Sequence, residues 1–436
     1  MHAFSRCVKL RGSARRMCAA FGTSLAYYES PRGRYRGRSR RLFVPRELAD
    51  ERGLIVEAVF GLDDRAQARR ERTAPAAIPS GSQLLEALAP MLRKNGRAGG
   101  GERIALVELG GGFRHADVRA FFRDARLAKA PRVSAVSVDG ASNRPGADEK
   151  ADAEVALDIG VVGCFAPAAE IVVYFAPPTD RGYVDAVYAA ILRTPQPSVI
   201  SLSWGDRESN WSAQACYALD QAFAAAAALG ITVCAATGDR GSNDGRRSRR
   251  AHVDYPASSP WVLACGGTQL DTRHDVEIVW NDRFGATGGG VSELYPLPPW
   301  QKRARPRVPR SVNPGRHRGR GLPDVAGLAH WYPIPLRTRD GDWSADGGTS
   351  AVAPLWAACI ARANRELRSR VGLLAPLLYG DAGEAGFVDV VRGHNGAYRA
   401  RRGWDACTGY GSPHPSAFVD ALAAALRAAA PAAPRG

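Results

Sequence analysis

The sequence predicts an α/β fold with a mostly parallel central sheet and helices on both of its faces. Two observations predict it. Short apolar runs recur along the chain, at Ile104–Leu109, Val133–Val138, Ile171–Phe175, Val199–Leu202, Ile231–Ala236 and Val262–Cys265. Helix-like stretches separate or follow them, at about 115–127, 152–165, 181–193, 212–229 and 351–366. Continuously apolar strands that alternate with helices are typical of a parallel sheet buried on both faces.

The segments outside this pattern define the expected domain organisation. The expected units are an arginine-rich amino-terminal region (1–74), a linker or processing region (75–101) and a main domain (102–430). Within them we expect a strand at Arg41–Pro45, a helix at Arg46–Phe60, a short helix near Leu84–Arg93 and a long surface loop at 296–322, which is rich in Pro, Arg and Gly.

The positive charge is concentrated in two segments. The 436 residues carry a formal net charge of +16. Residues 1–74 hold 17 basic and eight acidic side chains, and residues 301–320 hold eight basic and no acidic ones. Nucleic-acid-binding proteins usually carry their basic face on the folded body, which is close to neutral here, so a nucleic-acid partner is not expected. The longest uncharged run, Gln221–Gly238, is shorter than the roughly 20 residues of a membrane-spanning helix.

A glycine-rich segment before an alanine-rich helix carries a candidate nucleophile. Residues 347–354 read Gly-Gly-Thr-Ser-Ala-Val-Ala-Pro. Ser350 is predicted to cap the helix, with its hydroxyl at the positive end of the helix dipole and glycines that let a substrate backbone approach. The same pattern also fits an ordinary capping serine after a turn.

Three carboxylates are candidates for general acid–base catalysis. Glu154 and Asp158 are four residues apart on a predicted helix and therefore share one face. In solvent such a pair is only mildly repulsive, but this helix is apolar nearly all round, and in a cleft one carboxyl can keep its proton. Asp239 follows an apolar strand between Gly238 and Arg240. It is either a turn residue or a side chain that projects into the crevice at the carboxyl end of the sheet.

Histidine and cysteine are not arranged for catalysis or for metal binding. The sequence contains no G-x-S-x-G motif, and no histidine stands where a Ser-His-Asp triad needs its base. The eight cysteines form no C-x-x-C pair, which argues against zinc and thioredoxin-like sites. Gly110–Gly112 is a poor dinucleotide-binding fingerprint. A serine nucleophile would therefore need a carboxylate base, which works at low pH, where histidine is protonated.

Together, these motifs resemble the sedolisins, the serine-carboxyl peptidases with a subtilisin-like fold, and most closely their kumamolisin-like branch. The resemblance runs from about Glu102 to Pro413. Its stretches are 104–112, 134–143, 154–177, Ser201-Leu202-Ser203-Trp204-Gly205, 238–242, 264–268, Thr287-Gly288-Gly289-Gly290-Val291-Ser292, Pro323-Asp324-Val325-Ala326-Gly327 and the Ser350 segment. The number of motifs in one order makes the resemblance specific.

The resemblance implies a triad of Ser350, Glu154 and Asp158. Ser350 would attack the peptide carbonyl, and Glu154 would take its proton and later deliver it to the leaving amine. Asp158 would hydrogen-bond to Glu154 and tune it. Asp239 matches the family's oxyanion acid, which must be protonated in order to donate a hydrogen bond. Both requirements favour acidic pH.

The resemblance also implies supporting residues. Glu108 and Trp204 match positions that extend the hydrogen-bond network behind the triad. The residues that match the family's substrate cleft are Trp204, Gly288, Gly289, Gly290 and Asp254.

One structural calcium ion is implied near the carboxyl terminus. The matching ligands are the carboxylates of Asp389 and Asp405 and the carbonyls of Val390, Arg401 and Gly403, and oxygen donors suit this hard cation. Arg401 departs from the family, in which a glycine is usual here. This arginine and its basic neighbours are expected to lower the affinity for calcium.

The amino-terminal region departs from the family more strongly. Sedolisins are made with an amino-terminal prodomain, and residues 1–74 are interpreted as a remnant of its carboxyl-terminal part, without a convincing signal peptide. The expected function is a monomeric serine-type endopeptidase that hydrolyses proteins or peptides at acidic pH, extracellularly, with neither nucleic acid nor membrane as a partner. The alternative is a catalytically silent fold that acts as a binding or structural module because the prodomain is incomplete.

Overall fold

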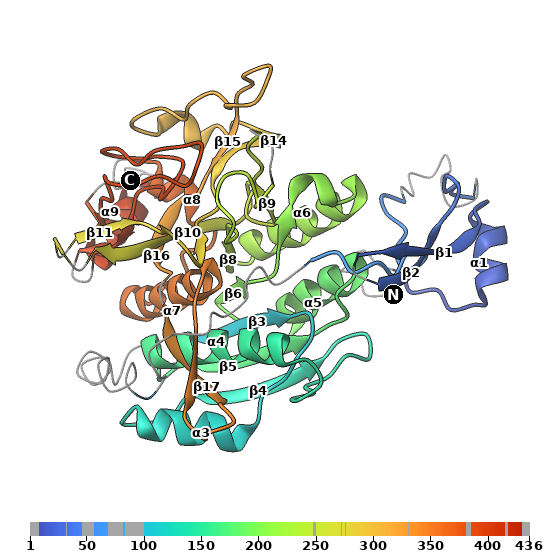
Figure 1. Cartoon of the computed structure of the whole chain (residues 1–436), viewed down its shortest axis with the longest axis horizontal. Helices are drawn as coiled ribbons and strands as arrows, with labels where there is room; N and C mark the ends of the chain where they lie inside the picture. Colours follow the sequence, from blue (N-terminus) through green and yellow to red (C-terminus); the bar gives the residue numbers. More distant parts are fainter. Residues whose placement is uncertain are drawn as a thin grey trace, which may run out of the picture.

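All the predicted apolar runs form strands of one central sheet (Figure 1). They are β3 (Arg103–Glu108), β4 (Arg132–Ser137), β5 (Glu170–Phe175), β6 (Val199–Leu202), β8 (Thr232–Ala236) and β10 (Leu263–Asp271). Their order is β10-β8-β6-β3-β5-β4, and each neighbouring pair is parallel. β16 (Val325–Leu328) pairs with β10 in parallel, and β11 (Val276–Val279) pairs with it antiparallel. The predicted mostly parallel sheet is confirmed.

This computed structural model describes residues 8–31, 33–45, 56–68, 82, 100–246, 250–271, 273–274, 276–329, 331–380, 385–414 and 417–429. Outside the strands of the central sheet, its covering helices and the amino-terminal elements, these ranges contain β7 (Asp206–Arg207), η2 (Glu208–Asn210), β9 (Asp254–Tyr255), β12 (Asn281–Asp282), β13 (Gly285–Ala286), β14 (Gly290–Pro296), η3 (Trp300–Arg303), β15 (Gly319–Leu322), β17 (Tyr332–Arg337), β18 (Trp343–Asp346), α8 (Ala375–Leu378), β19 (Phe387–Val388), β20 (Ser412–Pro413) and α9 (Phe418–Ala429).

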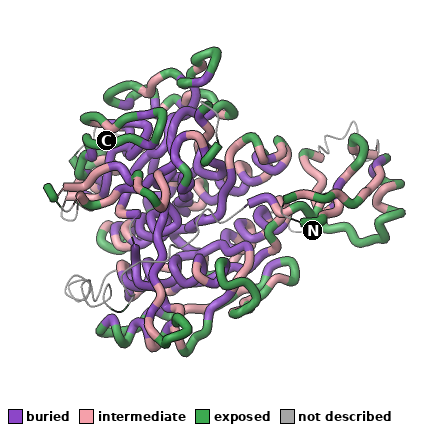
Figure 2. Tube along the Cα trace, viewed as in Figure 1, coloured by how far each residue is buried: buried purple, intermediate pink, exposed green. Residues whose placement is uncertain are grey.

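Helices cover both faces of the sheet, as predicted. The covering helices are α3 (His115–Asp124), α4 (Glu149–Phe165), α5 (Asp180–Leu192), α6 (Ala213–Ala228) and α7 (Thr349–Leu367). Alternate residues of β3 face the two helical layers on opposite sides of the sheet. Ile104 and Leu106 belong to the cluster with α3, α4 and α7, whereas Ala105 and Val107 belong to the cluster with α5 and α6. Figure 2 shows the buried residues concentrated along the sheet and these helices.

The helices begin where side chains cap them. Asp148 precedes α4, and its side chain accepts hydrogen bonds from the backbone N–H groups of Lys150 and Ala151. Thr179 and Ser212 cap α5 and α6 in the same way. The cap explains why α4 begins at Glu149, earlier than the apolar pattern alone predicts.

The amino-terminal elements differ from those expected. A helix, α1 (Ala14–Ala20), and a hairpin of β1 (Leu25–Ser30) with β2 (Gly33–Arg38) project from the main body (Figure 1). The strand expected at 41–45 is wrong: these residues have no regular structure, because the hairpin already pairs β1 with β2 and Pro45 has no N–H to donate. Of the helix expected at 46–60, residues 56–60 are not helical. Its other residues and the helix near 84–93 lie outside the described ranges.

The stretch 296–322 is only partly the surface loop that was expected. It contains η3 and β15, which pairs antiparallel with β14. Gln301 is buried. Its side-chain N–H group donates to the carbonyl of Gly321, and its side-chain oxygen accepts from the Gly321 N–H. The Gln301 side chain thus satisfies the backbone N–H and carbonyl of Gly321 and connects η3 to β15.

Among the described residues, the structure contains no helix with the length and hydropathy of a membrane span.

Candidate active site

Ser350 lies at the amino terminus of α7. It is the second residue of the helix and is 4% exposed. The predicted capping role is wrong, because Gly348 occupies the cap position with a φ of 98°. A Cβ atom on Gly348 would lie 2.2 Å from Oδ2 of Asp239, so both the backbone conformation and the neighbour favour glycine there. The Ser350 hydroxyl lies 3.5 Å from the carbonyl oxygen of Ser203.

Asp239 meets the same helix terminus from the sheet. It follows β8, and its Oδ1 accepts hydrogen bonds from the backbone N–H of Thr349 (2.7 Å) and from the Thr349 hydroxyl (2.8 Å). Its other oxygen, Oδ2, is the one that faces Gly348. Asp239 therefore lies at the carboxyl end of the sheet, where the strand-end interpretation expected it, and contacts Thr349, the residue before Ser350. The Asp239 side chain is buried, with an exposed fraction of 4%.

Glu154 and Asp158 lie on α4, which packs against α7 through Ala156, Leu157 and Ala351. Both carboxyl groups are buried, with exposed fractions of 1% and 0%. The alternative of a solvated acidic helix face is therefore wrong. Two carboxyl groups buried one helical turn apart repel each other when both are ionised, which favours a shared proton.

Ser203 connects this pair to the candidate nucleophile, although the sequence analysis gave it no role. Its hydroxyl lies 2.9 Å from each carboxylate oxygen of Asp158 and 3.2 Å from the carbonyl oxygen of Ser350. It stands directly after β6, at the carboxyl edge of the sheet. That position and the Ser-Trp-Gly sequence were the available signals.

A second buried network lies behind the pair. Glu108 ends β3, and its Oε2 accepts a hydrogen bond from the indole N–H of Trp204 at 2.8 Å. The hydroxyl of Tyr183 donates to the Trp204 carbonyl at 2.7 Å. Burial, with the negative charges of Glu108 and Asp158, raises the pKa of Tyr183 well above its usual value, so this phenol remains a neutral donor. No sequence pattern indicated a role for Tyr183.

The predicted cleft residues lie beside the Asp239 strand end. The N–H of Gly288 donates to the carbonyl of Gly238 at 2.7 Å, and a Cβ on Gly288 would lie 1.8 Å from the Thr237 carbonyl. Gly289 precedes β14 and Gly290 begins it, so only the last of the three glycines is in a strand. Asp254 is buried, and its Oδ2 would lie 2.4 Å from a Cβ on Gly238.

The predicted calcium ligands converge on one loop. Asp389 accepts a hydrogen bond from the N–H of Gly403 (2.8 Å), and Asp405 accepts one from the N–H of Arg401 (3.0 Å). Burial raises the pKa of Asp405 to about 6. Val390 is fully buried. Within the described ranges no group of three or more His, Cys, Asp or Glu side chains has a metal-binding arrangement, so backbone oxygens would have to complete a site here.

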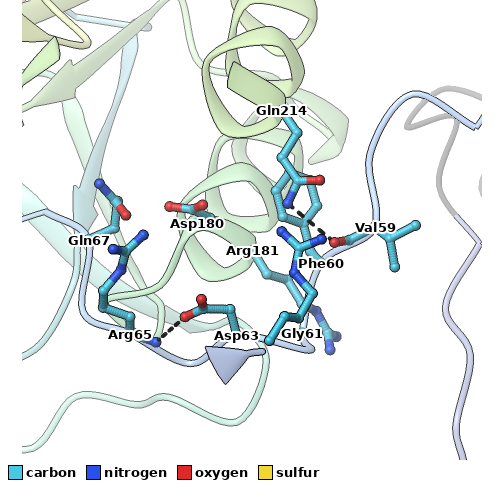
Figure 3. A pocket seen from close by; sticks show the side chains of 10 residues that line it. Val59, Phe60, Gly61, Asp63, Arg65, Gln67, Asp180, Arg181 and Gln214 are labelled. Atoms are coloured by element: carbon cyan, nitrogen blue, oxygen red, sulfur yellow. Dashed lines mark hydrogen bonds between the residues drawn. The ribbon is translucent and has the colours of Figure 1, made fainter. Parts of the chain in front are cut away.

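A pocket elsewhere contains none of the candidate catalytic residues. It lies between the amino-terminal segment 59–67 and the first turns of α5 and α6 (Figure 3). Arginines 38, 65 and 181 line it together with Asp63 and Asp180. Burial raises the pKa of Asp180.

Comparison with known proteins connects this geometry to a family. The subtilase family model matches residues 146–370. The solved structure of Pseudomonas sedolisin, a serine-carboxyl proteinase complexed with two molecules of pseudo-iodotyrostatin, matches with a TM-score of 0.65 and 25% identity, covering 81% of this chain and 100% of sedolisin. Kumamolisin from Bacillus sp. (strain MN-32) is 44% identical over 431 residues, which span 92% of this chain and 76% of kumamolisin. The chain belongs to the sedolisin family.

A mammalian relative is similar over a shorter span. Tripeptidyl-peptidase 1 of Canis lupus familiaris is 32% identical over 249 residues, which span 52% of this chain and 43% of the dog protein. As a member of the sedolisin family, this protein is a serine-type peptidase with a subtilisin-like fold.

Proposed function

We propose that this sedolisin-family peptidase is an endopeptidase that hydrolyses proteins and peptides at acidic pH, with Ser350, Glu154 and Asp158 as its triad and Asp239 as its oxyanion donor. One observation carries the proposal: two buried acidic systems meet at the first turn of α7. Asp239 accepts from Thr349, the residue before Ser350, and Ser203 links Asp158 to the Ser350 backbone. We also propose that the enzyme acts extracellularly, in an acidic medium.

These positions support the following chemistry. The Ser350 oxygen forms a bond to the peptide carbonyl carbon as Glu154 takes the hydroxyl proton, and the carbonyl electron pair moves onto oxygen. Collapse of this intermediate breaks the C–N bond, and Glu154 returns the proton to the leaving amine. Water then repeats the sequence on the acyl-enzyme, with Glu154 as base and then acid. Asp158, held by Ser203, would orient Glu154.

Asp239 suits the oxyanion role only in its protonated form. Its Oδ1 accepts two hydrogen bonds from Thr349, so the acidic proton belongs on Oδ2, which faces the helix terminus at Gly348. A neutral carboxylic acid there donates to the developing oxyanion, beside the positive end of the helix dipole. As the pH rises and the proton leaves, the donor becomes a repelling charge.

Replacement of Asp239 tests this proposal. Asp239→Ala is expected to lower kcat on the order of 10²- to 10³-fold, the usual effect of losing one oxyanion donor. Asp239→Asn is expected to recover part of that loss, because the amide oxygen can accept from Thr349 and the amide nitrogen can donate. Since asparagine does not ionise, its activity should decline less steeply with rising pH than that of the wild type.

The measurement is kcat from about pH 3 to 7 on a peptide whose amino terminus is acetylated. Cleavage of this peptide separates an endopeptidase from an enzyme that removes tripeptides from free amino termini. An Asp239→Ala enzyme with wild-type kcat, or an Asp239→Asn enzyme with an unchanged pH profile, contradicts the oxyanion role.

We also propose that calcium binds to the carboxylates of Asp389 and Asp405 and to the carbonyls of Val390, Arg401 and Gly403. The donor set supports it: two carboxylates and backbone oxygens are typical calcium ligands. In the part of the chain that the structure describes, none of the three carbonyl oxygens accepts a backbone hydrogen bond. A bound cation would also offset the burial that raises the pKa of Asp405.

Calcium removal is expected to lower stability without direct loss of chemistry. A ligand present at about 100 times its Kd stabilises the folded state by about 2.7 kcal/mol, so a chelator should lower Tm by several degrees. Asp389→Asn and Asp405→Asn proteins should lose this response, whereas Arg401→Gln, which keeps the carbonyl and removes a positive charge, should bind calcium more tightly. A Tm that is insensitive to both chelator and added calcium in the wild type contradicts the site.

A further inference from the structure

A strongly basic surface lies on two segments that are far apart in the sequence. The first is the insertion between β14 and β15, and the second is the loop that follows β19; Figure 1 shows both on the same side of the molecule. Their exposed basic residues, which define the basic surface, are Lys302, Arg303, Arg305, Arg307, Arg310, Arg316, Arg318, Arg392, Arg399, Arg401 and Arg402.

Direct contacts hold the two segments together. The Arg401 guanidinium donates to the carbonyl of Arg307 at 3.3 Å. The N–H of Trp404 donates to the carbonyl of Arg305 at 2.9 Å. The Tyr398 hydroxyl accepts from the N–H of Val312 at 3.4 Å. Positive charge from both segments therefore belongs to one continuous face.

Acidic side chains form few direct pairs with this face. Within the described ranges, none of the residues of the basic surface takes part in an ion pair of 4.0 Å or less. The ion pairs nearest to it along the chain are Arg320–Asp324 (2.8 Å) and Arg250–Glu293 (3.9 Å), and none of these four residues belongs to the basic surface. Arginines at this density create a long-range field that attracts anionic partners.

The loop 392–402, which carries four residues of the basic surface, contacts the loop that contains Asp239. In the loop 392–402, the carbonyl of Asn395 accepts from the N–H of Ser242 (2.8 Å), and the N–H of Ala397 donates to the Ser242 hydroxyl (2.8 Å). Ser242 lies on the loop that begins with Asp239. Tyr398 of the same loop would contact a Cβ on Gly290 at 2.9 Å, so it also packs against the predicted cleft strand.

We propose that the basic surface is an exosite that recruits acidic polypeptide substrates to the active site. This proposal rests on the proposed function and names its substrate class. Guanidinium groups pair with carboxylates through two parallel hydrogen bonds, and a chain held along loop 392–402 would be delivered beside Asp239. The aromatic residues of these segments are buried (Tyr398, Trp404 and Tyr410) or partly buried against the core (Trp300), which does not suit the exposed stacking platforms of single-stranded nucleic-acid sites.

The pH dependence of substrate recruitment follows from the charges of the arginines and of the substrate carboxyl groups. Arginine remains charged throughout, whereas Asp and Glu side chains of an unfolded substrate ionise near pH 3.9 and 4.3. Recruitment should therefore be strong at about pH 5 and vanish near pH 3, where the substrate carboxyls are protonated. A phosphodiester polymer would keep its charge at both values.

Two fluorogenic peptides with one uncharged cleavage segment test the exosite, one ending in about eight Glu residues and the other in the same number of Gln residues. At about pH 5 and low salt, the wild type should cleave the Glu peptide with about tenfold higher kcat/KM, through KM, and about 0.3 M salt should abolish the difference. The combined variant Arg307→Gln/Arg318→Gln/Arg402→Gln should reduce this preference to about twofold, with unchanged kcat on the Gln peptide.

The matched control removes three exposed arginines from α3 and the turn after it, at Arg119, Arg123 and Arg126. In Figure 1, α3 lies at the opposite end of the molecule from β14 and β15. This Arg→Gln control should keep the full preference. Equal kcat/KM for both peptides in the wild type overturns the exosite, as does a preference that the basic-surface variant retains. Salt-sensitive retention of duplex DNA at about pH 3 without any preference for the Glu peptide also overturns it, in favour of a phosphodiester partner.

Failure of the exosite and failure of the proposed function are distinguishable. If the wild type cleaves neither peptide, the proposed function fails. Equilibrium binding of the Glu peptide to the Ser350→Ala protein then decides the exosite separately, with tight salt-sensitive binding in support and equal binding of both peptides against it.

Discussion

Ser350→Ala is expected to reduce casein hydrolysis at about pH 4 by a factor on the order of 10⁴ or more, because it removes the only atom that forms the covalent intermediate. Its stability should be close to that of the wild type. The Ser350 hydroxyl makes a single long contact, 3.5 Å to the Ser203 carbonyl, so its loss removes little from the folded state. Activity and Tm are measured on the same preparation.

A peptide aldehyde supplies a second readout. In the wild type, the Ser350 oxygen adds to the aldehyde carbon, and the former carbonyl oxygen gains a proton to form a hemiacetal. The aldehyde should therefore raise the Tm of the wild type and leave that of Ser350→Ala unchanged. The control Ser134→Ala makes the same chemical change on the edge strand β4 and should keep full activity. Wild-type hydrolysis by Ser350→Ala would end the claim that this serine is the nucleophile.

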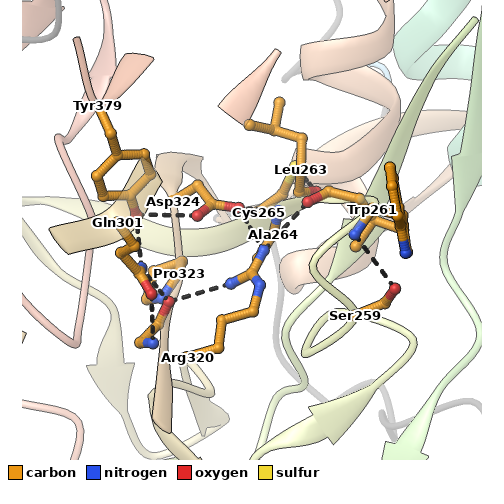
Figure 4. A network of polar contacts seen from close by, with 12 residues as sticks. Ser259, Trp261, Leu263, Ala264, Cys265, Gln301, Arg320, Pro323, Asp324 and Tyr379 are labelled. Carbon is orange, nitrogen blue, oxygen red and sulfur yellow. Dashed lines mark hydrogen bonds and ion pairs between the residues drawn. The ribbon is translucent and has the colours of Figure 1, made fainter. Parts of the chain in front are cut away.

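Arg320→Met is expected to destabilise the fold by about 3–5 kcal/mol, the usual effect of leaving a buried charge without its partner. Arg320 and Asp324 are both fully buried, and the guanidinium donates to the carboxylate at 2.8 Å (Figure 4). The same carboxylate accepts from the Tyr379 hydroxyl and the Ala264 N–H, and Arg320 also donates to the Val262 carbonyl. This pair thus joins β15 to the beginning of β10 in the central sheet.

Two comparisons isolate the effect of the buried charge. Arg320→Met/Asp324→Asn removes both charges and should be more stable than the single variant. Arg132→Met breaks a 3.9 Å pair with Glu170 in which the arginine side chain is 83% exposed, so it should cost less than about 1 kcal/mol. The urea midpoint and Tm provide the measurement. If Arg320→Met is as stable as Arg132→Met, the buried pair has no structural importance.

The sheet was predictable because its signals are local. Strands buried on both faces must be apolar throughout, and the runs that became β3, β5, β6 and β8 differ from their predicted ranges by at most one residue at each end. The exposed hairpin of β1 and β2 has no such run. Its alternating polar sequence, for example Gly33–Arg38, gave too weak a pattern, and the strand was expected at 41–45 instead.

The candidate site was predictable where it depends on spacing within one element. A separation of four residues brings Glu154 and Asp158 to one face of a helix whatever the surroundings. Asp239 was predictable because parallel strands present their carboxyl ends at one edge of the sheet. Ser350 was assigned to the correct helix end, but its expected capping role was wrong: the contact between Gly348 and Asp239 involves residues 109 positions apart, which no local pattern contains.

Several features follow from the sequence alone because each depends on periodicity or on motifs within a few residues. They are the succession of strands and helices along the chain, the pairing of Glu154 with Asp158 on one helix face, the position of Asp239 after a strand, and the family resemblance. Only the tertiary structure decided which groups meet. It brought Ser203 between Asp158 and Ser350, buried Arg320 with Asp324, and joined two basic segments into one surface. These contacts come from the packing of distant elements, and packing is a property of the whole fold rather than of any stretch of the chain.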